Sequence, residues 1–123
     1  MSERTPRIDE RMAYTLTVTE TFDAAHFLPD FDGECRNMHG HTWKVEVSWN
    51  FAELGQGGYP GMARCFAELK QQVRDVLPDH QCLNDVWGWV PTAEKIARWL
   101  CEEVDADEVR VWESATACAT YRT

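Results

Sequence analysis

The stretch His39-Gly-His-Thr-Trp-Lys-Val-Glu-Val-Ser-Trp-Asn-Phe51 decides the fold of this chain. From Trp43 onward, large apolar residues alternate with polar ones, which is the pattern of a β-strand with one buried face. Side chains two residues apart in a strand point the same way, so His39 and His41 lie on the face of Trp43. The stretch therefore predicts a strand whose apolar face carries two neighbouring imidazoles.

An earlier segment, residues 14–22, alternates in the same way, with threonines on its polar face. Its apolar face consists of Tyr14, Leu16, Val18 and Phe22. Residues 28–34 supply turn chemistry, so we expect the two strands to pair as a hairpin. His26 shares the parity of the apolar face and would then lie beside the other two histidines, unless a β-bulge intervenes.

Three of the four histidines of the protein thus fall in one region, namely His26, His39 and His41. Three neutral imidazoles suit zinc, which catalytic sites hold with a fourth position open. A hydrogen-bonded core histidine is the ordinary alternative, but it does not explain why three of four cluster. Cys35, just before the pair, is either a fourth ligand of a closed structural site or a thiol kept free for chemistry. Zn²⁺ is the predicted cofactor.

The composition is that of a single globular domain. The chain has 123 residues, 44% hydrophobic and 27% charged, with a formal net charge of -9. Nucleic acids and anionic membranes require a basic surface, so both are excluded as partners, whereas an anionic small molecule can still bind local cations. No apolar run approaches the roughly 20 residues of a membrane span.

Residues 1–11 carry charges throughout and no apolar core of a secretion signal, so they are predicted to be a polar N-terminal extension before a domain at 12–123. The five cysteines are an odd number and lack paired-finger spacing. Together these features predict a cytoplasmic protein with reduced thiols.

Two helices and two further strands are expected in the rest of the chain. The first helix has an apolar stripe ended by Pro78, and the second begins at Pro91-Thr92. Their stripes are Phe66, Leu69, Val73, Val76 and Leu77, and then Ala93, Ile96, Ala97, Leu100 and Val104. A third strand presents Val109, Val111 and Glu113 on one face, and residues 117–121 form a fourth. The order β-β-α-α-β-β predicts an α+β fold with an antiparallel four-stranded sheet and both helices on one face. The two unpaired sheet edges favour oligomerisation.

Several motifs in this order resemble the 6-pyruvoyl-tetrahydropterin synthase / 6-carboxy-tetrahydropterin synthase family of the tunnelling fold. They are Phe22-Asp-Ala-Ala-His26, Cys35-x3-His39-Gly-His41, Gly61-Met62, Phe66-x-x-Leu69-Lys70, Asp79-His80-x-x-Leu83-Asn84, Pro91-Thr92-x-Glu94 and Glu113. Three residues between the cysteine and the His-Gly-His resemble the 6-carboxy branch, which serves queuosine and 7-deazapurine biosynthesis.

The resemblance implies a role for each motif residue. His26, His39 and His41 bind zinc, Cys35 is the catalytic thiol, Asp79 and His80 form a proton-handling pair, and Glu113 anchors the pterin. It also implies a zinc-dependent lyase acting on 7,8-dihydroneopterin triphosphate, with active sites between the subunits of a homohexamer built as a dimer of trimers, an oligomeric barrel. Arg36, Lys44 and Lys70 are candidates for holding the triphosphate.

Chemistry supports these roles, although alternatives stay open. A thiol beside a cation has a lowered pKa, and histidine titrates near neutrality. A carboxylate's two oxygens match the two parallel donors of a pterin, but Glu113 can instead pair with a distant arginine. The chain departs from the family at Cys65, where an acidic residue usually precedes the first helix, and at Ser114, where threonine is common. A 6-pyruvoyl-type activity and a non-catalytic zinc-binding domain are the alternative functions.

Overall fold

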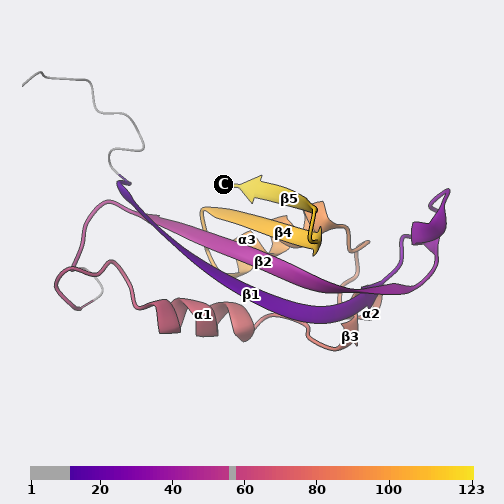
Figure 1. Cartoon of the computed structure of the whole chain (residues 1–123), viewed down its shortest axis with the longest axis horizontal. Helices are drawn as coiled ribbons and strands as arrows, with labels where there is room; N and C mark the ends of the chain where they lie inside the picture. The colour runs from indigo at the N-terminus through magenta and orange to yellow at the C-terminus, as the bar shows by residue number, and fades with distance from the viewer. Residues whose placement is uncertain (1–11, 56–57) are drawn as a thin grey trace, which may run out of the picture.

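The computed structural model describes residues 12–55 and 58–123, and the predicted extension at 1–11 lies outside them. A five-stranded sheet runs through the molecule in the order β3-β1-β2-β4-β5 (Figure 1). The strands are β1 (Tyr14–His26), β2 (His39–Phe51), β3 (Gln81–Cys82), β4 (Glu108–Ser114) and β5 (Ala117–Arg122). The helices are the 3-10 helix η2 (Glu34–Arg36), α1 (Phe66–Arg74), α2 (Leu83–Val86) and α3 (Ala93–Glu103).

The predicted α+β class is confirmed, but the prediction of four strands, all antiparallel, is wrong. The fifth strand, β3, has two residues and pairs in parallel with β1, so the sheet is mixed. Two residues are too few to display an alternating pattern, and the short helix α2 follows them at once. Neither element has a period that the sequence could show.

The long hairpin of β1 and β2 has the predicted parity. Its register runs without interruption from the pair Tyr14 and Phe51 to the pair His26 and His39. On one face Phe22 and Trp43 are buried and stacked, with ring centroids 6.1 Å apart. The threonines of β1 alternate with these buried residues on the other face. The hairpin therefore delivers its histidines to the buried side.

Both long helices contribute to one hydrophobic core against this face. Leu69 and Val73 of α1 are fully buried, and α3 contributes Ile96, Ala97, Leu100 and Cys101. Thr92 caps α3, because its hydroxyl accepts a hydrogen bond from the Lys95 N–H at 3.2 Å. The stripe expected for the second helix is confirmed.

The first helix is shorter than its sequence pattern suggested. It ends at Arg74, and Phe66, expected on the apolar stripe, has 54% of its surface exposed. Cys65 at the N-cap makes no side-chain hydrogen bond to the helix, as expected from the poor capping ability of a thiol. Among the residues described, no helix has the length and apolarity that crossing a membrane requires.

Candidate metal centre and active site

Three strands bring four potential ligands to one point. His26 ends β1, His39 and His41 begin β2, and Glu113 lies near the end of β4. One ligand atom from each of the four lies within 4.8 Å of the others. The imidazole centroids of the three histidines are 4.5–5.1 Å apart. The structure thus brings together all three histidines that the sequence predicted to be metal ligands.

Backbone carbonyls fix the orientation of two of the rings. His26 Nδ1 lies 2.8 Å from the Pro91 oxygen, and His39 Nδ1 lies 2.6 Å from the Asn37 oxygen. A carbonyl oxygen can only accept a hydrogen bond, so each Nδ1 carries the proton and donates. The Nε2 atom of each ring then keeps a free lone pair, which is the tautomer that a metal-ligating histidine uses.

Two ring nitrogens of the cluster lack a hydrogen-bond partner among the residues that the structure describes. The Nε2 atoms of His26 and His41 are buried without a hydrogen-bond partner. Glu113 Oε1 lies 3.2 Å from His26 Nε2, yet both atoms are acceptors when Nδ1 carries the ring proton. Burial holds the pKa of His41 below its ordinary value, although the Glu113 carboxylate opposes this shift. Neutral nitrogens and a carboxylate facing one another fit a bound cation, and nitrogen and oxygen ligands of this kind suit zinc.

Glu113, which the sequence analysis assigned to pterin binding, lies directly beside the histidines. Its Oε1 atom is also 3.4 Å from His41 Nε2, and 39% of its side chain is exposed. The Glu113 side chain reaches the face of the sheet that carries Val109 and Val111, as the sequence pattern predicted, although the pairing of β4 with β5 is irregular between Trp112 and Ser114. The proximity to the histidines was missed because it depends on the pairing of β4 with β2, which no sequence signal specified. The carboxylate is positioned to contact either a metal or its bound ligand.

Cys35 lies in η2, on the loop that joins β1 to β2, and is half-buried. Its backbone oxygen accepts a hydrogen bond from the Leu28 N–H at 2.8 Å, which closes that loop. In the part of the chain that the structure describes, Cys35 belongs to neither group of clustered ligand atoms. The fourth member of the histidine cluster is Glu113, not this thiol.

Asp79 and His80 form a second group together with Asp23. The Asp79 carboxylate contacts His80 Nδ1 at 2.9 Å and accepts a hydrogen bond from the Asp23 N–H at 2.8 Å. The latter bond is the main cause of an Asp79 pKa below its ordinary value, with a further contribution from His80. His80 has a φ of 58°, unusual for a residue with a side chain, and its N–H donates to the Asp23 oxygen at 2.6 Å. The predicted proton-handling pair is therefore held firmly in place.

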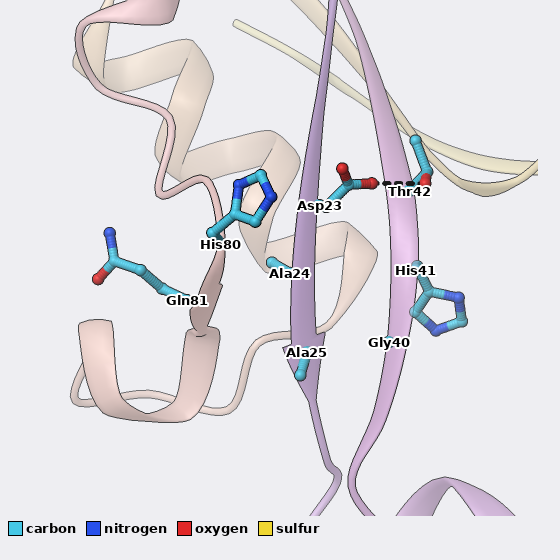
Figure 2. Close-up of a pocket in the computed structure, with 8 residues that line it drawn as sticks. All are labelled: Asp23, Ala24, Ala25, Gly40, His41, Thr42, His80 and Gln81. Carbon is cyan, nitrogen blue, oxygen red and sulfur yellow. Dashed lines mark hydrogen bonds between the residues drawn. The ribbon is translucent and has the colours of Figure 1, made fainter.

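The pair and the histidine cluster do not converge within one chain. Asp23 and Thr42 lie opposite each other on the polar face, whereas the next register pair, Ala24 and His41, faces the core side. A hollow of about 500 Å³ is lined by both His80 and His41. Figure 2 shows His80 on the β3 side of β1, while the His41 ring lies beyond β2. Two partial sites therefore flank the same end of the hairpin.

The candidate cations for a triphosphate lie apart. Arg36 ends η2 near the histidine end of the hairpin, and Lys70 is exposed on α1. Lys44 stands over the Trp112 ring, with its amine 4.6 Å from the ring centroid. The structure does not bring these three residues together.

Zinc content should distinguish the three clustered histidines from His80, the fourth histidine of the chain. We expect the purified chain to hold one zinc per subunit and His39→Ala to lose it, because removal of one of three nitrogen ligands opens the site. The control is His80→Ala, which removes the exposed histidine of the other group and should keep its metal. Elemental analysis after dialysis measures both. Equal zinc in the two variants would contradict the assignment.

Comparisons with known proteins agree with this architecture. The sequence model of the 6-pyruvoyl tetrahydropterin synthase family matches residues 15–123. A 6-carboxy-5,6,7,8-tetrahydropterin synthase of Haemophilus influenzae is 32% identical, over 83% of this chain and 94% of the relative. The Synechocystis enzyme of the same name is 34% identical, over 82% and 87%. The structure of Caenorhabditis elegans 6-pyruvoyl tetrahydropterin synthase superposes with a TM-score of 0.76 at 25% identity, covering 89% of this chain and 95% of that one. This chain belongs to the 6-pyruvoyl tetrahydropterin synthase family.

Proposed function

We propose that this protein is a zinc-dependent 6-carboxy-5,6,7,8-tetrahydropterin synthase. It converts 7,8-dihydroneopterin triphosphate into 6-carboxy-tetrahydropterin, acetaldehyde and triphosphate, a step of queuosine and 7-deazapurine biosynthesis. The observation that carries the proposal is the set of three imidazoles grouped at one point, two of them with a buried, unpartnered Nε2. The two bacterial relatives bear this name, and the chain has the Cys35-x3-His39-Gly-His41 spacing of that branch.

Each group of side chains has a separate task in this proposal. The three histidines would hold a zinc ion, which when bound would supply Lewis-acid chemistry at the hydroxyls of the substrate side chain. The two oxygens of Glu113 accept hydrogen bonds from the amino group and ring N–H of the pterin, which orients the ring. Cys35 and the pair of Asp79 and His80 move protons at the side-chain carbons.

The functional unit in this proposal is a homohexamer, a dimer of trimers. Asp79 and His80 have side-chain exposures of 53% and 77%, so both are open to a second molecule. Strands β3 and β5 are the two edges of the sheet, and unpaired edges are suited to strand pairing between copies. A second copy that places its exposed pair beside the first copy's histidine cluster would complete one active site from two partial ones.

A 6-pyruvoyl-type activity is the second candidate, favoured by the close superposition on the Caenorhabditis elegans enzyme. The two activities release different products from one substrate. Incubation of the zinc-loaded protein with 7,8-dihydroneopterin triphosphate, followed by mass spectrometry, should detect 6-carboxy-tetrahydropterin and acetaldehyde. Formation of 6-pyruvoyl-tetrahydropterin would support the second candidate, and an unchanged substrate would contradict both.

Cys35→Ala tests the role of the thiol. Because Cys35 lies outside the ligand cluster, the variant should keep its zinc while turnover falls by about 10²-fold or more, the usual contribution of a proton-transfer group. Cys118→Ala is the matched control, since Cys118 is exposed on β5 and should retain full activity. Zinc per subunit and product formation are measured on both variants. Loss of zinc from Cys35→Ala would instead identify the thiol as a ligand.

Glu113→Gln tests the carboxylate. The amide replaces one acceptor by a donor that faces the donors of the pterin, and an unpaired buried polar group costs about 1–3 kcal/mol. We expect affinity for a pterin product to fall while zinc content stays intact, as measured by calorimetric titration and elemental analysis. A variant with normal pterin affinity and depleted zinc would assign Glu113 to the metal.

A further inference from the structure

The motif Leu83-Asn84 has no role in the chemistry described above, although it follows Asp79-His80 directly. Leu83 is fully buried and belongs to the core, which explains that residue. Asn84, half-buried on α2, binds the backbone of Phe27 twice. Its Nδ2 donates to the Phe27 oxygen at 2.9 Å, and its Oδ1 accepts from the Phe27 N–H at 3.0 Å. One side chain therefore satisfies both backbone groups of the residue that follows His26.

These two bonds continue the edge of the sheet past the end of its strands. Strand β3 pairs in parallel with β1 through Ala24 with Gln81 and Ala25 with Cys82. The same register would pair Phe27 with Asn84, but the chain has already turned into α2 at Leu83. The side-chain amide of Asn84 carries the same donor and acceptor as a peptide group, and it takes the place of the missing strand partner.

The same segment also holds the ring of His26. Beyond α2 the chain leads to Pro91, whose carbonyl accepts the hydrogen bond from His26 Nδ1 at 2.8 Å, a buried contact. His26 has 1% of its surface exposed, the least among the three clustered histidines. Residues 81–91 thus fix His26 at its ring and at the peptide that follows it. The direction of the free Nε2 depends on both.

We propose that Asn84 is a positioning residue of the metal site. By anchoring Phe27, it holds the end of β1 so that the His26 ring meets Pro91 and directs Nε2 to the cluster before a metal binds. A ligand that is already oriented need not be ordered during binding, which raises metal affinity. This inference rests on the proposed metal site, and it assigns a function to a side chain that touches neither metal nor substrate.

Two variants separate positioning from general stability. Asn84→Ala removes both bonds to Phe27. Asn84→Asp keeps the acceptor for the Phe27 N–H but places an oxygen where the donor was. Asn50→Ala is the matched control, because Asn50 Oδ1 accepts a side-chain hydrogen bond from Thr15 at 2.8 Å near the opposite end of the hairpin. Circular dichroism and light scattering establish that each variant keeps the fold and assembly of the wild type.

The main measurement is the zinc dissociation constant, obtained by competition with a chromogenic chelator. We expect Asn84→Ala to bind zinc about 10-fold more weakly. Mutation of residues that orient metal ligands typically lowers metal affinity by this factor or more. Asn84→Asp should also bind zinc more weakly, because a carboxylate oxygen then faces the Phe27 carbonyl oxygen, and Asn50→Ala should match the wild type. If Asn84→Ala fails to fold, Asn84→Asp alone decides the question, with weaker zinc binding expected.

A second measurement needs no metal. In ¹⁵N-labelled metal-free protein, the His26 ring should show a slowly exchanging Nδ1 proton, bound to Pro91. The exchange rate of that proton should rise in Asn84→Ala and stay the same in Asn50→Ala. A general loss of stability would not produce this difference.

The possible failures can be told apart. A wild-type chain that takes up no zinc would refute the metal site and this inference with it. The role of Asn84 alone would be refuted if the wild type binds zinc and a folded Asn84 variant has the same zinc affinity and the same proton exchange rate. Equal weakening by Asn50→Ala and Asn84→Ala would also overturn it, since the effect would then be one of stability.

Discussion

The unbroken antiparallel register between β1 and β2 is the constraint on which the rest of the structure depends. The register ends with His26 opposite His39, and it leaves His41 two residues further on the same face. A slip of one residue would send the side chains of one strand to the opposite face and separate the three imidazoles. The aromatic and aliphatic residues of both strands oppose such a slip, because it would expose Trp43 and its neighbours to water. The register that packs the core is thus the same register that brings the three histidines together.

The histidine cluster is placed where it weakens the fold of a metal-free chain. Two buried Nε2 atoms have no partner in the described part of the chain, and each such atom costs about 1–3 kcal/mol. When Nδ1 carries the only ring proton of His26, the Glu113 carboxylate faces a second acceptor at 3.2 Å, which adds repulsion. A cation at the centre would turn each of these contacts from unfavourable to favourable. A cation bound there would therefore couple metal binding to folding and stabilise the end of the hairpin.

The features that the sequence predicted are those with a period or a close spacing. The two long strands and the α3 stripe from Ala93 to Val104 have strong periods, and the structure has them. Strand β3 and helix α2 are too short to have one. The place of Glu113 beside the histidines and the separation of Asp79 from them depend on strand order, which is set by tertiary packing. The family resemblance implied active sites between subunits, and the fold adds that within one chain the pair and the histidines form two separate groups beside one hollow.

The segment after Pro78 carries the exposed pair of Asp79 and His80. His80 adopts a positive φ, which for a residue with a side chain costs of the order of 1 kcal/mol or more, and it leaves its ring exposed. Both hydrogen bonds to the backbone of Asp23 hold this conformation against the strain. The chain next pairs as β3, turns into α2 and clamps Phe27 through Asn84. A segment of six residues, 79–84, therefore presents the exposed pair of Asp79 and His80 at one end and holds the residue after the buried His26 at the other. The strained backbone of His80 leaves its ring exposed, and this exposure is what the proposed active site between two copies would need.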